Sequence, residues 1–247
     1  MNNIEQKFLT LNKYSRPGIK LSSVKNLIIH WVGNPGTSAM ANRNYFENLK
    51  YGKNGTYASS QYIIGLNGEI VQCIPENEVA YHAGNLTYNY NSIGIENCHP
   101  DWSGKFNEKT YNALIDLLTE LCKKYNLSPN KIIRHYDVTG KDCPKYYVEN
   151  ENEFVEIRNN VAEKMGTKIE DETIEKEEFN VAKTYKNGST VEEVFEDSAL
   201  TTKIGSLDKY EVCECLDIVD GKYIVKYKVN NTNEYKVGFV KYSGGVS

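Results

Sequence analysis

Two histidines and one cysteine are the residues whose types and spacing point most directly to chemistry in this 247-residue sequence. His30 directly follows the apolar run 27–29, and His135 follows a second short run at 132–134. Cys143 comes eight residues after His135. Two imidazoles and one thiolate form a three-ligand set for zinc that leaves the fourth position open for water or substrate, as catalytic sites require. The pattern therefore predicts one zinc ion bound by His30, His135 and Cys143.

Each of these residues taken alone has a simpler interpretation. A histidine at the end of a strand is more often a hydrogen-bonded structural residue than a metal ligand. The stretch 132–144 is more informative, because a histidine at a strand end is followed by a loop that returns a lysine and a cysteine. A strand end is also rigid enough to hold a ligand without the slack of a loop.

Five short motifs, in chain order, resemble one known family. They are Ile29-His30-Trp31, Gln61-Tyr62-Ile63-Ile64, Tyr81-His82-Ala83-Gly84, Asn91-Ser92-Ile93-Gly94-Ile95-Glu96 and the stretch from His135 to Pro144. Through them, residues 20–165 are similar to the amidase family that includes phage lysozyme-type amidases, cytoplasmic anhydromuropeptide amidases and peptidoglycan recognition proteins. The resemblance implies a zinc-dependent amidase that cuts the amide bond between N-acetylmuramic acid and L-alanine in bacterial peptidoglycan. It also implies the same three zinc ligands and a mixed central β-sheet with helices on its faces.

Glu96 and Lys141 are the candidates for catalysis. Amide hydrolysis needs a base that takes a proton from the attacking water, and a cation or donor where the carbonyl oxygen becomes negative. The side chain of Glu96 is expected to point out from the non-core face of the predicted strand 92–96, and Lys141 lies two residues before Cys143. The family pattern likewise has a glutamate after Ser-Ile-Gly-Ile and a lysine before the last ligand. Each residue alone would be interpreted as an ordinary solvated charge.

Two further residues are expected to contact substrate by the same resemblance. His82 lies in the segment that resembles the family's substrate-lining loop, where an imidazole is able to bond muramyl or peptide carbonyls. Asn91 begins the motif that ends in Glu96. The alternative for His82 is a structural hydrogen bond within its loop.

The chain departs from the family pattern at one position. Some members use a catalytic tyrosine near the hairpin that contains Gln61, where this chain has Ser60. This difference favours Glu96 as the single base. The remaining histidine, His99, precedes Pro100 and is expected to pack in a turn. The cysteines outside the zinc set are predicted to be structural: Cys73, Cys98, Cys122, Cys213 and Cys215.

The apolar patterns predict both strands and helices before residue 166, and the resemblance implies that they form an α/β (α+β) fold with a mixed sheet. In the strand 92–96, Ile93 and Ile95 point to one face while Ser92 and Glu96 point to the other. A capping box between Asn150 and Glu153 is expected to open the last helix of this part. The other predicted elements are a strand at 24–29, a hairpin of 61–65 with 69–73, and a helix over 111–125.

The sequence predicts two domains joined by a linker. A catalytic domain is predicted to span residues 1–165. The segment 166–178 has six acidic and two basic residues with few large apolar ones, so it is predicted to be a linker. Residues 179–247 are predicted to form a small all-β barrel, with strands separated by turn signals at 187–188, 220–221 and 230–231. This region resembles the Src-homology-like cell-wall-binding barrels of phage endolysins, which implies a cell-wall polymer as partner.

Charge and composition exclude some classes of protein. With 29 basic and 33 acidic residues the net charge is -4, so no basic surplus exists for a phosphate backbone, and we expect no nucleic acid partner. No continuous apolar segment resembles an export signal or a membrane span of about 18 residues. We therefore expect no stable membrane association, and a cytoplasmic protein with reduced thiols until lysis. The oligomeric state is left open.

These features together predict a phage endolysin that reaches the wall once a holin opens the membrane. The first alternative is a host autolysin. The second is a non-catalytic peptidoglycan-binding protein, although that class arises when the zinc ligands are lost, and all three persist here. The third is a zinc peptidase that cuts within the stem peptide, because ligand spacing alone does not choose the bond.

Overall fold

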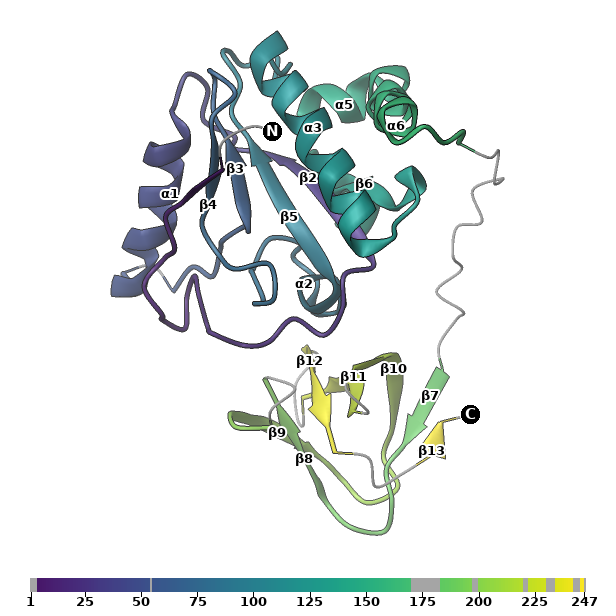
Figure 1. Ribbon diagram of the computed structural model, residues 1–247. Helices are drawn as coiled ribbons and strands as arrows, with labels where there is room; N and C mark the ends of the chain where they lie inside the picture. The colour runs from purple at the N-terminus through teal and green to yellow at the C-terminus, as the bar shows by residue number, and fades with distance from the viewer. Residues whose placement is uncertain are drawn as a thin grey trace. The chain divides into compact units, whose positions relative to one another are not determined.

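The structure, a computed structural model, describes residues 4–53, 55–169, 183–196, 200–219, 222–229, 234–241 and 245–246. The chain divides into two compact units, Met1–Glu170 and Asp171–Ser247 (Figure 1). Most of the expected linker, the start of the expected second domain and the expected turns at 220–221 and 230–231 lie outside the described residues.

A six-stranded mixed sheet forms the centre of the first unit. Its strands lie in the order β1-β4-β3-β5-β2-β6, and β3 pairs with β4 as an antiparallel hairpin while the other pairs are parallel. The predicted strands and hairpin are confirmed. Their bounds are β1 (Ile4–Gln6), β2 (Asn26–Trp31), β3 (Tyr62–Ile64), β4 (Ile70–Gln72), β5 (Ser92–Asn97) and β6 (Ile132–Arg134).

Helices cover both faces of this sheet (Figure 1). α1 lies on one side, and α3 and α6 lie on the other, where the expected helix over 111–125 is confirmed. Among the described residues, no helix is both long enough and apolar enough to span a bilayer. The helices are α1 (Ala39–Asn48), α2 (Leu86–Asn91), α3 (Glu108–Tyr125), α4 (His135–Thr139), α5 (Lys145–Glu149) and α6 (Glu151–Met165), with short 3-10 turns η1 (Leu49–Tyr51) and η2 (Pro129–Lys131).

The two faces of the sheet have different roles. Ile29 of β2 and Ile95 of β5 are fully buried in the larger core with the apolar stripe of α3 and the inner face of α6. Because side chains alternate along a strand, His30 and Glu96 leave the opposite face. The predicted division of β5 into a packing face and a face free for chemistry is therefore confirmed.

The expected capping box at the start of α6 is wrong. Asn150 precedes α6, but its side chain makes no capping hydrogen bond. Its amide donates instead to the carbonyl of Tyr146, and the Glu153 carboxylate accepts from Lys105 and from the Tyr146 hydroxyl. The neighbouring helix α5 ends directly before Asn150, and its last turn takes up the side chain that would otherwise form the cap.

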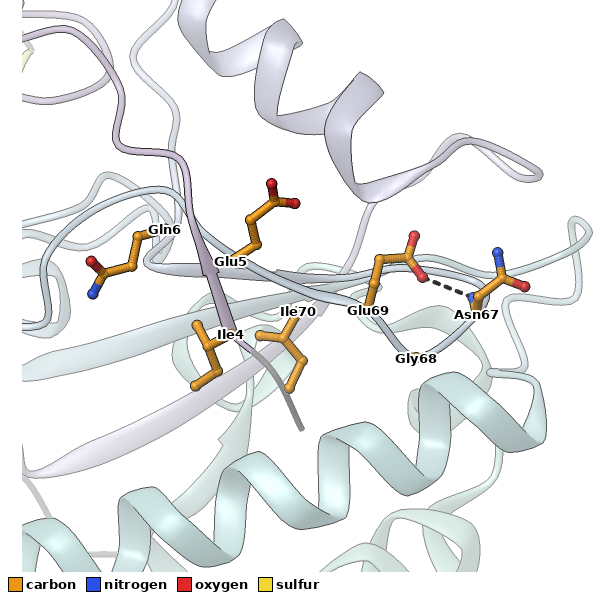
Figure 2. Close-up of a pocket in the computed structure, with 7 residues that line it drawn as sticks. All are labelled: Ile4, Glu5, Gln6, Asn67, Gly68, Glu69 and Ile70. Carbon is orange, nitrogen blue, oxygen red and sulfur yellow. Dashed lines mark hydrogen bonds between the residues drawn. The ribbon is translucent and has the colours of Figure 1, made fainter. Parts of the chain in front are cut away.

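A shallow hollow lies where β1 joins the outer edge of the sheet (Figure 2). Its walls are residues 4–6 of β1 and residues 67–70 of the hairpin turn. The Glu69 carboxylate there accepts a hydrogen bond from the Asn67 backbone N–H. Strands β4 and β3 separate β1 from β5 and β2, so this hollow is not part of the site that holds His30.

The second unit is an all-β structure with antiparallel pairing. Its strand order is β13-β7-β10-β11-β12-β8-β9, and its core includes Tyr185, Val225 and Tyr227 with the two buried cysteines Cys213 and Cys215. The strands are β7 (Lys183–Lys186), β8 (Glu192–Phe195), β9 (Lys203–Leu207), β10 (Val212–Val219), β11 (Lys222–Lys228), β12 (Tyr235–Val240) and β13 (Gly245–Val246).

Candidate active site

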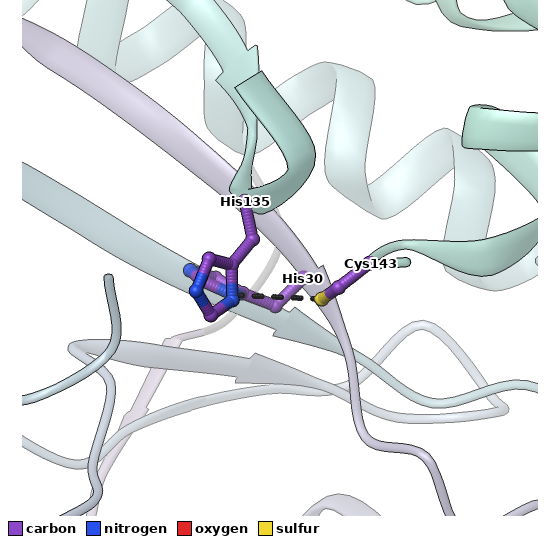
Figure 3. Close-up of side chains that lie close together, drawn as sticks. All are labelled: His30, His135 and Cys143. Carbon is purple, nitrogen blue, oxygen red and sulfur yellow. Dashed lines mark hydrogen bonds between the residues drawn. The ribbon is translucent and has the colours of Figure 1, made fainter. Parts of the chain in front are cut away.

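Three predicted ligands, His30, His135 and Cys143, meet at one point in the first unit (Figure 3). One donor atom from each lies within 4.8 Å of the others, and all three residues are buried. The Cys143 Sγ is 3.7 Å from the Nδ1 of His30. His30 and two residues 105 and 113 positions further along the chain are thus brought to within the span of a single ion, as the sequence predicted.

The sheet explains why the two histidines converge. β2 and β6 are parallel neighbours, and Ile29 is paired with Arg134. His30 and His135 each follow one member of that pair, so both stand at the same level of the sheet. His135 begins the short helix α4 rather than the loop expected from the sequence. The Arg134 guanidinium, which donates to Asp137, anchors the first turn of that helix.

Cys143 is brought back to the histidines by a backbone hydrogen bond. The N–H of Tyr136, in the first turn of α4, donates to the carbonyl of Cys143 at 2.9 Å. The backbone N–H of Trp31, the residue after His30, donates to the Cys143 sulfur. Cys143 is therefore held by residues next to both histidines, through its backbone on the side of α4 and through its sulfur on the side of β2.

The buried nitrogen atoms test whether the site fits a metal ion. The His135 Nδ1 is fully buried and has no hydrogen-bond partner, a state that costs free energy unless a ligand completes it. The His30 Nδ1 faces the Cys143 sulfur, while its Nε2 is 3.0 Å from the Nδ1 of His82. Two imidazole nitrogens and one sulfur are therefore directed at one point, and this donor set suits zinc.

Burial sets the protonation of these groups. It lowers the pKa of His30 well below its usual value and the pKa of His135 to about 4, so both rings are neutral at pH 7 and have free lone pairs. Burial also raises the pKa of the Cys143 thiol to about 12. Metal binding at neutral pH must therefore release the thiol proton.

Glu96 lies beside this cluster. It is paired in register with His30 across β5 and β2. Its Oε2 is buried without a hydrogen-bond partner, and burial raises the pKa of the carboxyl to about 8, an effect that the charge of Lys141 opposes. A carboxylate with a pKa near neutrality is able both to accept and to return a proton at physiological pH.

Lys141 is a cation whose charge acts on the groups of the candidate site. Its side chain is exposed on the segment between α4 and Cys143. Burial has the largest effect on these groups, and the charge of Lys141 opposes its raising of the pKa of Glu96 and Cys143 and adds to its lowering of the pKa of His135. The structure therefore brings both predicted catalytic groups to the three predicted ligands.

The two residues expected to contact substrate are largely covered. His82 is 7% exposed, with one ring nitrogen against His30 and the other 3.4 Å from the Ser92 hydroxyl. Asn91 is 4% exposed at the end of α2, and its Oδ1 has no partner. Ser60, at the position of the family's tyrosine, is buried and donates to the Tyr62 carbonyl.

His99 packs in its turn, as expected. Its Nδ1 is 2.7 Å from the Asp101 carbonyl, and its ring stacks on Trp31 at 4.7 Å between centroids. Two supporting residues were missed by sequence reasoning. Asn89 accepts hydrogen bonds from two backbone N–H groups of the 81–84 loop, and Gly94 gives His82 room against β5. The glycine within Ser-Ile-Gly-Ile was a usable signal, whereas nothing in the sequence singled out Asn89.

Comparison with known proteins identifies the family. Residues 20–146, just over half of the chain, match the family described as N-acetylmuramoyl-L-alanine amidase. The matched region holds strands β2 to β6 of the sheet, the three candidate ligands, Glu96 and Lys141. The chain therefore belongs to the N-acetylmuramoyl-L-alanine amidase family.

Individual relatives agree with this assignment. The chain is 34% identical over 201 residues to the N-acetylmuramoyl-L-alanine amidase CwlL of Bacillus licheniformis, covering 77% of this chain and 54% of that protein. It is 37% identical over 180 residues to the N-acetylmuramoyl-L-alanine amidase BlyA of Bacillus subtilis, covering 65% of this chain and 47% of that protein. The chain thus spans about half the length of these relatives.

Solved structures resemble the first unit. A mutant endolysin from Bacillus subtilis aligns with a TM-score of 0.54 and 29% identity, covering 65% of this chain and 99% of that one. The catalytic domain of XlyA aligns with a TM-score of 0.53 and 26% identity, covering 64% and 99%. The α/β architecture of the first unit is therefore that of amidase catalytic domains.

Proposed function

We propose that this protein is a zinc-dependent N-acetylmuramoyl-L-alanine amidase that hydrolyses the amide bond between N-acetylmuramic acid and L-alanine in bacterial peptidoglycan. The observation that carries the proposal is the buried His30, His135 and Cys143 cluster, with Glu96 in register beside it, in a chain of the amidase family. The class of reaction comes from the family, and the residues that perform it come from the geometry.

The ion would be held by the Nδ1 atoms of His30 and His135 and by the Cys143 thiolate. When bound, zinc supplies Lewis acidity, which polarises a carbonyl and makes water more acidic. Glu96 accepts the proton of the attacking water, because its Oε2 atom is buried beside the cluster and has no hydrogen-bond partner. It then returns that proton to the departing L-alanine nitrogen. Lys141 offers positive charge to the carbonyl oxygen as that oxygen becomes negative.

The second unit is proposed to bind the cell wall. Catalytic domain 1–165, linker 166–178 and a Src-homology-like domain 179–247 would together tether the enzyme to its substrate. The all-β core and antiparallel pairing of the second unit support this assignment. A tethered wall-binding domain raises the local concentration of substrate around the catalytic domain.

We further propose a role as a phage endolysin, which acts on the wall from a cytoplasmic store at lysis. Its support is the likeness of the first unit to a mutant endolysin from Bacillus subtilis. A host autolysin remains the alternative role. Peptidoglycan is the proposed substrate in both, and a wall polymer is the proposed partner of the second unit.

Digestion of purified cell walls by the full chain tests the reaction. We expect new free amino groups on L-alanine and glycan strands released from intact stem peptides, both identified by mass spectrometry. A chelator should abolish the release, and added zinc should restore it. Cleavage within the stem would instead indicate a peptidase, and wall binding without any release would indicate a receptor. Either outcome would reject the amidase assignment.

A further inference from the structure

We propose that His82 and Ala83, fixed in place by the side chain of Asn89, form the outer support of the metal site and hold His30 and His135 with their Nδ1 atoms toward the ion. This inference rests on the zinc site proposed above. It assigns His82 a positioning role in place of the substrate contact expected from the sequence.

His82 supports His30 directly. The Nε2 of His30 lies 3.0 Å from the Nδ1 of His82, and the two rings meet edge to face at 5.1 Å between centroids. The other nitrogen of His82, Nε2, lies 3.4 Å from the Ser92 hydroxyl, and the ring also bonds the Ser92 backbone. Because the Ser92 hydroxyl donates to the Tyr88 carbonyl, it accepts from the ring.

The direction of this chain of hydrogen bonds fixes the tautomers. His82 donates from Nε2 to Ser92, so its Nδ1 is an acceptor, and the Nε2 of His30 must be the donor to it. The remaining nitrogen of His30, Nδ1, then has a free lone pair 3.7 Å from the Cys143 sulfur.

Ala83, the next residue, orients the second histidine, His135. Its backbone carbonyl accepts a hydrogen bond from the His135 ring. The bonded nitrogen is Nε2, because the Nδ1 of His135 is buried without a partner and Nε2 lies close to Gly84. The lone pair of Nδ1 is therefore left for a metal.

Asn89 fixes both supports at once. Its Oδ1 accepts from the backbone N–H of His82 at 3.1 Å and from that of Ala83 at 2.8 Å. Asn89 is 8% exposed within α2. One amide oxygen therefore sets the position of the His82 ring and of the Ala83 carbonyl relative to the sheet.

Gly94 allows the support to sit this close to the sheet. A Cβ atom at Gly94 would lie 2.4 Å from the Cγ of His82, so only glycine leaves room for the ring on β5. Groups that orient a metal-bound imidazole typically change metal affinity by about 10- to 100-fold when they are removed. We expect effects of that size from the loss of His82 or Asn89.

The tautomers provide the first test. The chain has only four histidines, so ring ¹⁵N spectra of the labelled full chain resolve every one. His30, His82 and His135 should carry the proton on Nε2, with zinc on the Nδ1 of His30 and His135. His99, whose Nδ1 bonds the Asp101 carbonyl, should show the opposite tautomer and serves as the internal reference. Zinc on the Nε2 of either ligand would overturn the proposal.

The second test measures zinc affinity by competition with a chelator. His82→Leu removes the acceptor, and His82→Asn restores an acceptor oxygen near the position of Nδ1. Asn89→Ala removes the fixing side chain, and Asn107→Ala is its matched control. Asn107 also accepts from a backbone N–H and donates to a carbonyl, but at the start of α3.

His82→Leu and Asn89→Ala should bind zinc about 10- to 100-fold more weakly, while His82→Asn and Asn107→Ala should stay within about threefold of the original chain. Far-ultraviolet circular dichroism of each metal-free variant checks that it is folded. Folded His82→Leu and Asn89→Ala variants with unchanged zinc affinity would overturn the inference and leave the zinc site intact. If the original chain itself binds no zinc, the proposed metal site fails, and the inference fails with it.

Discussion

His30 and Glu96 occupy the same register position on the neighbouring parallel strands β2 and β5, and both side chains leave the same face of the sheet. The candidate ligand and the candidate base are therefore separated by one strand spacing, about 4.8 Å between backbones. Neither depends on a loop for its position. This pairing places a carboxylate beside the metal cluster without making it a ligand.

Replacement of Glu96 by glutamine should leave the zinc site intact and remove most of the activity. The amide has the size of the carboxyl but accepts no proton, and loss of a general base typically costs about 100- to 10,000-fold in rate. The measurements are the rate of wall hydrolysis and the zinc content of the purified variant. Glu120→Gln, an exposed substitution on α3, is the control. A Glu96→Gln enzyme with a near-normal rate would reject the base role.

Replacement of Lys141 by alanine should reduce turnover by about 100- to 1,000-fold, as the loss of one electrostatic donor to a developing oxyanion does. Zinc affinity should change little, because Lys141 is exposed and is not one of the clustered ligands. Lys123→Ala, on the exposed side of α3, should behave like the original chain. If Lys141→Ala and Lys123→Ala have equal rates, Lys141 is only a solvated cation.

The pH dependence of stability in the metal-free protein should report the carboxyl of Glu96, whose Oε2 is buried. Its folded pKa of about 8 exceeds the ordinary value of 4.5, so the folded state keeps a proton that the unfolded chain releases. Stability from this group is present at low pH and is lost as pH rises toward 8. The buried histidines act in the opposite direction, because their pKa values are lowered and their stabilising effect is lost as pH falls below about 6.5.

Between pH 6.5 and 8, the three site histidines are neutral in the folded state but still lose protons in the unfolded chain, so they add a smaller rise in stability that is the same in Glu96→Gln. Relative to Glu96→Gln, the free energy of unfolding of the metal-free chain should therefore fall by roughly 1–2 kcal/mol over this window. Glu96→Gln itself should show only the rise from the histidines. Urea unfolding at a series of pH values measures both, and parallel curves for the two proteins would contradict the pKa of Glu96.

The sequence was sufficient to predict which residues cluster in the candidate site but not the residues that support them. Strand ends 27–29 and 132–134 were recognisable by their apolar runs, and the histidine after each of them, together with Cys143, predicted a shared ion. The clearest helix, α3, and the division of β5 into two faces followed from periodicity. These features depend on local patterns that a single sequence carries.

Other features depended on tertiary contacts and could not be read from the chain. His82 was assigned to substrate by family resemblance, whereas its ring lies between His30, 52 residues before it, and Ser92, 10 residues after it. The capping box at Asn150 failed because α5 ends against it. The helix at 135–139 was missed because it is short and its first turn is anchored by the Arg134 side chain rather than by an apolar stripe.

Replacement of Gly94 by alanine should weaken both the fold and the metal site. The new Cβ would lie 2.4 Å from the His82 ring, and that ring is buried and bonded on both nitrogens, so it has no free space to enter. Overpacking of this kind costs about 1–3 kcal/mol, and displacement of His82 should lower zinc affinity in addition. Thermal unfolding with and without zinc measures the two effects separately.

Gly65→Ala is the matched control for that substitution, because its Cβ would also meet a side chain, the Glu69 carboxylate at 1.9 Å. That carboxylate belongs to a partly exposed hairpin residue and is able to rotate away, so the stability should fall less and the zinc affinity should stay unchanged. If Gly94→Ala matches Gly65→Ala in both measurements, the close packing of His82 on β5 does not hold the metal site in place.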